Sequence, residues 1–447
     1  MKKILLFLAM CFAFANAQGF KPIKKLENIP EDKIQRTLNI SRDSLRKEFW
    51  LEVEKNEIVK ICIDNQIHAW ETSLNATIFN DSCIAFQAPM LIGTDSLKAY
   101  VPEKNESYTI FLAIGMKYLN FKNTEVLLGF NESLKKNQKT RHRCNVEGIG
   151  TIDCSPQEND PKRLMQLTAT YLVDKYPVTN CEFLQLMWDS IPQKSSYQYD
   201  SKRKIQEEWI SRKNTSNHNE TCITQDSAAN TVSLYQALKY ANARSMHENL
   251  KPYYLFSKTN ESRERIISEK QFVIGYWDFT EHKDKFFNVS VNQSSDGYRL
   301  PYYDEWMIFA RGGDKKKNAP WSDSATFEEA SKYAKFNTTY PNSEKEMYNS
   351  EPVGQLQPNG YGLYDIFGLV EEHVLLKKDL NGNRGLPSCR KGGEYYVSLD
   401  DEIGHPNWRE FNYGHFHIGQ SGAEAGFRLI RNIGNNAKWE NIESGSK

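Results

Sequence analysis

The stretch from Pro358 to Gly368 constrains the fold of this chain more than any other. It reads Pro-Asn-Gly-Tyr-Gly-Leu-Tyr-Asp-Ile-Phe-Gly, so turn-forming residues surround aromatic and aliphatic ones and a carboxylate stands close to a glycine. Asn and Gly favour tight turns, whereas the apolar side chains require burial. The pattern predicts a tight loop that leads into a buried strand, with Asp365 placed to cap the turn or to hold a cation.

Other short motifs lie on both sides of this loop. They are Asp-Lys-Tyr-Pro-Val-Thr-Asn at 174–180, Val-Ser-Leu-Tyr-Gln-Ala at 232–237, Gly-Tyr-Arg-Leu-Pro at 297–301 with Glu305-Trp306 and Ala-Arg-Gly-Gly at 310–313, Pro320-Trp321, Gly392-Gly393, and Gly-Phe-Arg-Leu-Ile-Arg at 426–431. In this order they resemble the sulfatase-modifying-factor family, which contains the formylglycine-generating enzymes and non-sulfatase relatives. The resemblance covers about residues 163–432. It implies an α+β, loop-rich domain related to C-type lectins.

The N-terminus has the pattern of a bacterial export signal. Two lysines precede an apolar run, Ile4 to Phe14, that is too short to span a bilayer, and Ala15-Asn16-Ala17 offers small residues for cleavage before Gln18. We therefore predict a cleaved signal peptide at 1–17 and a periplasmic, outer-surface or secreted protein. Lipidation at Cys11 is the alternative, although the apolar run continues past it. No later stretch approaches the length of a membrane helix, so no transmembrane segment is expected.

Short β-like runs separated by Asn, Asp, Gly and Pro extend from Phe49 to about Phe130 and indicate a small all-β, sandwich-like module. The predicted order is an N-terminal arm at 18–47, the β module at 48–133, a basic linker at 134–143, the sulfatase-modifying-factor-like domain at 144–433 and a polar tail at 434–447. The basic run at 135–143 could bind nucleic acid, but a solvated linker is favoured because the chain has 57 basic and 57 acidic residues. A nucleic-acid partner is not expected.

Three helices are predicted in the larger domain. Thr179 or Asn180 can cap a helix over 181–188, a second helix is predicted at 233–244 with Leu234, Ala237, Leu238 and Ala241 on one face, and a short third helix at 305–311. Arg299, Glu305 and Arg311 invite a catalytic interpretation. We favour a structural one, in which these side chains tie backbone groups together.

Seven of the eight cysteines remain after signal cleavage, and an oxidising compartment permits disulfides. The candidate pairs are Cys62 with Cys83 across a hairpin, Cys144 with Cys154 around a short loop, and Cys181 with Cys222 near the ends of the first helical region. The odd count leaves one thiol over, which we expect to be Cys389. The spacing of the cysteines is not typical of a zinc site.

The resemblance implies copper chemistry for some members of the family. Its oxidases convert a substrate cysteine to formylglycine with copper and oxygen, and they need two closely spaced cysteines after the Gly-Gly motif, because soft thiolates select copper(I). Here the stretch from Gly392 to Asp401 contains no cysteine, and Cys389 lies on the other side of the glycines. Copper-dependent oxidation is therefore not expected.

The resemblance also implies a calcium site that follows the Gly-Leu-Tyr motif. The matching ligand positions are Asp365, Gly368, Val370 and Glu372, and hard oxygen ligands suit calcium. The family has Gly-Asn-Val-Trp-Glu-Trp where this chain has Gly-Leu-Val-Glu-Glu-His at 368–373. The ligand positions are kept, whereas the Asn and both Trp are lost. The alternative is a metal-free turn with exposed acids.

A late histidine cluster, His405, His415 and His417, could also hold a metal, but ordinary loop histidines are favoured because no carboxylate stands at ligand spacing. The leading functional hypothesis is an exported, non-catalytic family member that binds a protein, peptide or glycan, or serves a structural role. One alternative is a divergent oxidase or other metal-dependent enzyme. Another is a lectin-like carbohydrate-binding protein, whose ligand surface would include exposed aromatic residues: Tyr395, Tyr396, Trp408 and Tyr413.

Overall fold

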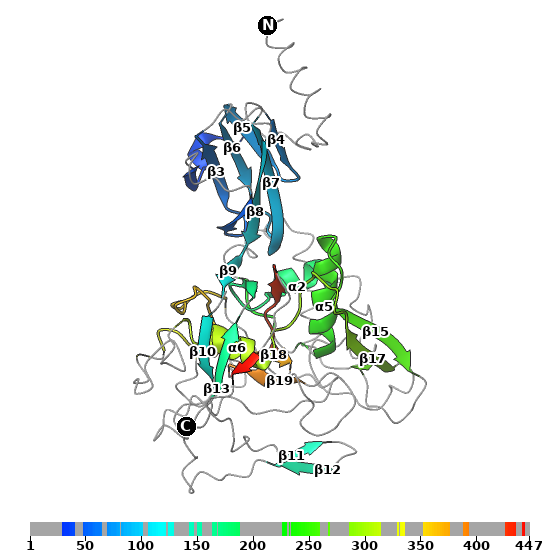
Figure 1. Ribbon diagram of the computed structural model, residues 1–447. Helices are drawn as coiled ribbons and strands as arrows, with labels where there is room; N and C mark the ends of the chain where they lie inside the picture. Colours follow the sequence, from blue (N-terminus) through cyan, green and yellow to red (C-terminus); the bar gives the residue numbers. More distant parts are fainter. Residues whose placement is uncertain are drawn as a thin grey trace, which may run out of the picture. The chain divides into compact units, whose positions relative to one another are not determined.

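The structure is a computed structural model of the 447-residue chain, and it divides into two compact units, Met1–Tyr118 and Leu119–Lys447 (Figure 1). It describes residues 29–40, 48–64, 69–80, 82–101, 106–121, 124–128, 143–146, 150–153, 163–167, 169–187, 226–229, 232, 234–259, 267–268, 286–313, 329, 331–335, 352–375, 388–392, 425–434 and 440–442. The chain is α+β with an N-terminal all-β module. Among the described residues, no helix is long and apolar enough to cross a membrane.

The first unit contains two four-stranded sheets and a short 3₁₀ helix, η1 (Glu31–Lys33) (Figure 1). One sheet has the order β1 (Arg36–Ile40), β3 (Ile58–Ile63), β6 (Cys83–Gln87), β5 (Ala76–Asn80), and the other has the order β2 (Glu48–Val53), β8 (Glu106–Ile114), β7 (Gly93–Val101), β4 (Ala69–Thr72). Strand β3 alternates partly exposed and buried residues, as a strand with one covered face must. Its buried residues share one core with Ile110 and Leu112 of β8. The two sheets therefore pack on each other, as a sandwich does.

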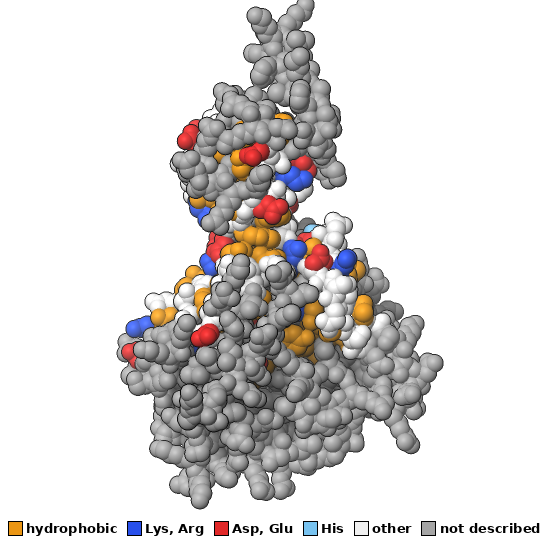
Figure 2. All heavy atoms as spheres, viewed as in Figure 1, with side chains coloured by type: hydrophobic (Ala, Val, Ile, Leu, Met, Phe, Trp, Pro, Cys, Tyr) orange, Lys and Arg blue, Asp and Glu red, His pale blue; other side chains and the backbone are white. Residues whose placement is uncertain are grey.

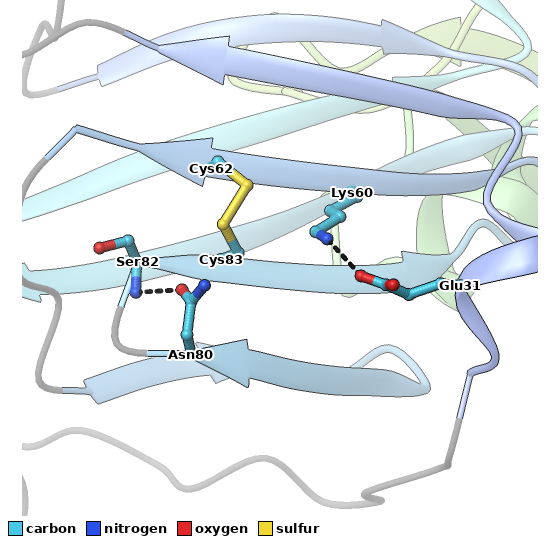
Figure 3. The surroundings of a disulfide bond; sticks show 6 residues. All are labelled: Glu31, Lys60, Cys62, Asn80, Ser82 and Cys83. Carbon is cyan, nitrogen blue, oxygen red and sulfur yellow. Dashed lines mark hydrogen bonds and ion pairs between the residues drawn. A yellow bond between two sulfur atoms is a disulfide. The ribbon is translucent and has the colours of Figure 1, made fainter.

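A disulfide joins Cys62 and Cys83, and this pairing is confirmed (Figure 3). The two residues are register partners on β3 and β6, with their Cα atoms 4.1 Å apart. Close by, Lys60 forms an ion pair with Glu31 at 2.9 Å. The bridge closes a segment that contains β4 of one sheet and β5 of the other. It therefore restrains the crossing between the two sheets.

Most of the other cysteines with predicted roles lie outside the residues or side chains that the structure describes. Cys181 is disulfide-bonded, and the side chain of its partner is not among those that the structure describes. Cys222, predicted as that partner, and Cys154 also lie outside them. Cys389 lies in β19 (Ser388–Lys391), but its side chain is not described.

The division between the units differs from the predicted domain boundaries. Strand β1 lies inside the predicted arm, yet it pairs with β3 and belongs to the β module. Strands β9 (Met116–Asn120) and β10 (Thr124–Leu128), predicted as part of that module, belong to sheets whose other strands come from the second unit. Apolar alternation indicates that a segment is a strand, but the sheet it joins depends on pairing with distant residues. The predicted linker lies outside the described residues except for Arg143, which begins a strand.

The second unit combines small sheets with short helices. The sheets are β10-β13-β22, β11-β12, β21-β14-β9, β15-β17-β16 and β19-β18-β20. The remaining strands are β11 (Arg143–Val146), β12 (Gly150–Asp153), β13 (Arg163–Leu167), β14 (Thr170–Asp174), β15 (Tyr254–Thr259), β16 (Ile267–Ser268), β17 (Phe286–Val291), β18 (Glu371–Leu375), β20 (Ala425–Gly426), β21 (Ile430–Asn432) and β22 (Glu440–Ile442). Among the described residues of this unit, the α-helices are α2 (Asn180–Met187), α5 (Leu234–His247) and α6 (Tyr303–Ala310), which confirms the three predicted helices.

Local sequence explains where α2 begins. The backbone N–H of Glu182 donates to Thr179 Oγ1 at 3.4 Å, and the N–H of Thr179 donates to Glu182 Oε2 at 3.0 Å. This reciprocal pair is a capping box with Thr179 as the N-cap, one of the two predicted caps. On α5 the four predicted apolar residues are all buried.

On the face shown in Figure 2, acidic and basic side chains of the described residues are interspersed, in keeping with the zero net charge.

Candidate functional site

The loop at 358–368 folds tightly against the end of α6. Asn359 is buried, and its Oδ1 accepts the N–H groups of Tyr361 at 3.0 Å and Leu363 at 3.2 Å. Its Nδ2 donates to the carbonyl of Phe309 at 2.7 Å. The loop then leads into β18, in which all five residues are buried. The predicted tight loop before a buried strand is therefore confirmed.

The backbone after this loop turns through left-handed conformations. Asp365 has a φ of 52°, Gly368 of 71° and Leu369 of 61°. A Cβ at Gly368 would lie 2.2 Å from the carbonyl oxygen of Lys335, so only glycine fits there. A leucine in this region costs about 1–2 kcal/mol. Its side chain is buried beside Ala228 and Val370, which offsets part of that cost.

Asp365 is a buried carboxylate at the start of this turn. Its Oδ2 accepts the N–H of Gly354 at 2.6 Å, and the residue is 5% exposed. Burial raises the pKa of Asp365 to about 6, although the Gly354 N–H and the Arg428 charge act in the opposite direction. The ionised carboxylate is therefore incompletely compensated, and an added cation would stabilise it.

Glu372 is more fully compensated. Its two carboxylate oxygens accept hydrogen bonds from Nε and Nη2 of Arg428 at 2.6–2.8 Å. Oε2 also accepts a hydrogen bond from Trp306 Nε1 at 2.7 Å. The carboxylate and the guanidinium are both fully buried. Arg428 also donates to the backbone carbonyls of Asp174 and Tyr364. Neither Asp365 nor Glu372 is the exposed acid that the metal-free alternative assumed.

The four predicted calcium positions thus lie within one buried turn and its adjoining strand. They offer hard oxygen donors, and Asp365 is a carboxylate that a cation would stabilise, so the residue types fit calcium. Glu372 already accepts N–H groups from Arg428 and Trp306, and a carboxylate has about four acceptor sites, so it has little capacity left. An ion here would be held chiefly by Asp365 and by backbone carbonyls.

Arg299 and Glu305 form a second buried pair. The guanidinium binds the carboxylate through two contacts, at 2.6 and 2.7 Å. Glu305 also accepts the N–H of Tyr302 at 2.8 Å, at the start of α6, and the hydroxyl of Tyr171 at 3.1 Å. One carboxylate therefore ties a helix start, a strand and a loop together. These contacts match the predicted structural role of both residues.

A third buried pair, Asp174 with Arg244, was missed by the sequence analysis. Arg244 Nη1 lies 2.9 Å from the Asp174 carboxylate, and both side chains are fully buried. Burial raises the pKa of Asp174 to about 6, against the effect of Arg244. The guanidinium also lies 3.9 Å from the centroid of the Tyr298 ring. Asp174 stands in a recognised motif, but Arg244 lies in the last turn of α5, where the sequence carries no motif, so no local signal joined them.

The Gly-Gly motif reaches the same region, since the N–H of Gly368 donates to the carbonyl of Gly392 at 2.7 Å. Residues 393–424 lie outside the described residues, and with them the predicted histidines and ligand-surface aromatics: His405, His415, His417, Tyr395, Tyr396, Trp408 and Tyr413. Within the described part of the chain, no group of three or more His, Cys, Asp and Glu side chains could hold a metal.

Comparison with known proteins gives matches of several kinds. A family model described as "Sulfatase-modifying factor enzyme 1-like domain" matches residues 131–433. The chain is 30% identical over 214 residues to "Chaperone protein LppX" of Paenibacillus barcinonensis, covering 45% of this chain and 68% of that protein. It is 35% identical over 79 residues to a formylglycine-generating enzyme of Thermomonospora curvata, covering 17% of this chain and 26% of the enzyme. A solved structure, Treponema denticola variable protein 1, aligns with a TM-score of 0.40 and 19% identity, over 73% of this chain and 96% of that one.

Proposed function

The chain belongs to the sulfatase-modifying factor enzyme 1-like family, and from this premise we propose that it is an exported, non-oxidising member that binds other polypeptides. The observation that carries the proposal is the lack of a cysteine pair after the Gly-Gly motif. The sequence contains no cysteine after Cys389, so the copper-binding pair that the family resemblance requires is absent. A family domain that cannot perform the oxidation keeps its capacity to bind.

Two further observations support this proposal. The relative from Paenibacillus barcinonensis is named a chaperone, and chaperones bind polypeptides. The Cys62–Cys83 disulfide supports export, because disulfides persist in oxidising compartments outside the cytoplasm. The predicted signal peptide at 1–17 is consistent with the same location.

We propose a C-type-lectin-like scaffold for the second unit, built from short sheets that buried ion pairs join to one another. Two other functions follow from different sequence features. A divergent oxidase would need a metal site built without the cysteine pair. A lectin-like protein would bind carbohydrate through the aromatic side chains of Tyr395, Tyr396, Trp408 and Tyr413.

The functional proposal makes a prediction with two readouts on one protein preparation. The purified protein should leave a Cys-x-Pro-x-Arg peptide unchanged in mass in the presence of copper and oxygen, because the stretch after its Gly-Gly motif has no cysteine pair to hold the metal. It should reduce light scattering from a reduced, aggregating client protein such as α-lactalbumin, in proportion to its concentration. Serum albumin at equal mass is the control. A protein-dependent change in peptide mass would support the oxidase instead, and unchanged aggregation would rule out polypeptide binding of this kind.

We also propose that the turn after the loop holds a structural calcium ion. Of the four predicted positions, Asp365 and the backbone carbonyls of Gly368 and Val370 would supply most of the oxygens and Glu372 the least, because Arg428 and Trp306 already occupy its carboxylate. The ion would offset the buried charge of Asp365. Such an ion would stabilise the folded state because the unfolded chain does not bring these positions together.

Chelation with EGTA should therefore lower the melting temperature, and excess calcium should restore it. At a hundredfold excess over the dissociation constant the stabilisation is about 2.7 kcal/mol. Asp365→Asn should abolish this calcium response. Glu372→Gln is the matched comparison: it should lower the melting temperature even without calcium, because it weakens the pairing of Arg428. An equal calcium response in wild type and Asp365→Asn would place any calcium site elsewhere.

A further inference from the structure

The outward face of the sheet β2-β8-β7-β4 carries two stacked aromatic rings, and a third ring, from β9 of another sheet, stacks beside them. Trp50 of β2 and Phe111 of β8 are register partners, with ring centroids 5.0 Å apart and planes at 23°. Tyr118 of β9 stacks on Trp50 as well, at 6.4 Å and 25°. Figure 1 shows β8 beside β7 in this unit. Trp50, Phe111 and Tyr118 are called the aromatic row below.

These rings do not serve the core. Phe49 and Leu51, which precede and follow Trp50 in β2, pack against the core of the first unit. Because side chains alternate along a strand, Trp50 points to the opposite face. Likewise Ile110 and Leu112 are core residues, which places Phe111 on the outer face. A cross-strand aromatic pair gives a sheet modest stability, but that effect does not require a third ring.

Polar side chains stand beside the aromatic row on this face. Ser96 of β7 is the register partner of Phe111, and Thr109 stands two residues before Phe111, so hydroxyls flank the row. Lys98, the register partner of Thr109, pairs with Glu71 at 3.2 Å. On the other side, the carboxylate of Glu52 is paired with Lys117 and accepts the N–H of Tyr118.

In each of the two pairs the lysine neutralises its glutamate partner, so this part of the face offers apolar rings and hydrogen-bonding groups with little net charge. Glu48, exposed at the start of β2, adds one carboxylate that can accept hydrogen bonds from hydroxyls. A ligand that matches such a face has apolar C–H surfaces beside hydroxyl groups and carries no charge. A neutral glycan has this chemistry, because one side of a sugar ring presents C–H bonds and its rim presents hydroxyls.

We propose that the aromatic row is a binding site for a neutral glycan chain, in which sugar rings lie against Trp50, Phe111 and Tyr118. Ser96 and Thr109 supply hydroxyls to the rim of the sugars. The site lies in the first unit, outside the region matched by the family, and it does not depend on polypeptide binding by the second unit.

The test is affinity electrophoresis of the full chain in native gels that contain hydroxyethylcellulose, galactomannan, laminarin or pullulan, with alginate as the acidic comparison. At least one neutral polysaccharide should retard the wild-type protein, and Trp50→Ala should weaken this binding at least tenfold. Phe79→Ala is the matched control, because it removes a partly exposed ring from β5 in the other sheet; it should bind like wild type.

Ser96→Arg provides a second variant in case Trp50→Ala fails to fold, since it places a long side chain on the same face and leaves the rings intact. It should reduce binding as strongly. The proposal is overturned by any of three results: no retardation by any neutral polysaccharide, equal binding by wild type and folded Trp50→Ala or Ser96→Arg, or retardation by alginate alone. Binding of reduced α-lactalbumin that is lost in Trp50→Ala, without glycan binding, would instead make the row a polypeptide site and would equally overturn it.

Discussion

Replacing Arg428 with methionine should destabilise the second unit by about 3–5 kcal/mol, the usual cost of breaking a buried ion pair by removing one partner. The substitution leaves the Glu372 carboxylate buried without its cation and removes hydrogen bonds to the carbonyls of Asp174 and Tyr364. Chemical denaturation, followed by a signal from the second unit, measures the change. The two units can unfold in separate transitions, so each is fitted by itself.

A double variant, Arg428→Met with Glu372→Leu, separates the charge effect from the loss of packing. Because it leaves no buried charge, it should recover part of the stability that Arg428→Met loses. Lys98→Met is the control for an accessible pair. The Lys98 side chain is 42% exposed and pairs with Glu71, so loss of this pair should lower the free energy of unfolding by less than about 1 kcal/mol. If Arg428→Met cost no more than Lys98→Met, the buried pair would not be what stabilises this unit.

Removing the Cys62–Cys83 bridge should destabilise the first unit by about 3 kcal/mol, the value expected for a cross-link that closes a loop of this length. The cysteines are 21 residues apart, and the loop between them contributes strands to both sheets. The unfolded chain gains freedom when the bridge is lost, whereas the β3–β6 pairing keeps its hydrogen bonds. Denaturation of Cys62→Ala/Cys83→Ala, compared with wild type, measures the change.

The double substitution is a cleaner test than a reducing agent, because Cys181 is also disulfide-bonded and would be reduced at the same time. Cys181→Ala is therefore the matched control, and it should leave the transition of the first unit unchanged. A loss of less than 1 kcal/mol in Cys62→Ala/Cys83→Ala would mean that sheet pairing alone restrains the unfolded loop.

Local features were predictable from the sequence. The tight loop at 358–368 and the three helices each rest on residues close in the chain, such as Thr179 with Glu182 in the capping box. The Cys62–Cys83 pairing was also predicted, but across a hairpin, whereas β4 and β5 lie between the two bridged strands. Family membership was predictable for the same reason, because it depends on short motifs in a given order. The structural role of Arg299 and Glu305 also followed, since only six positions separate them.

Long-range features were not predictable in the same way. A local pattern can indicate whether β1, β9 and β10 are strands. It does not indicate which sheet each strand joins, because their partners lie far along the chain. The third pair, Asp174 with Arg244, joins residues 70 positions apart. The burial of Asp365 and Glu372, expected as exposed acids in one alternative, likewise depends on residues that the turn meets only in the folded chain.

The sequence by itself determined the family, the local turns and helices and the missing thiol pair, because each is a property of residue types at short spacing. Only the tertiary structure decided that Glu372 is neutralised by Arg428 while Asp365 remains a carboxylate that a cation would stabilise. It also decided that Trp50, Phe111 and Tyr118 form one row on an outward face. The physical reason is the same in both cases: charge compensation and ring stacking depend on distances between side chains that chain folding, rather than sequence spacing, brings together.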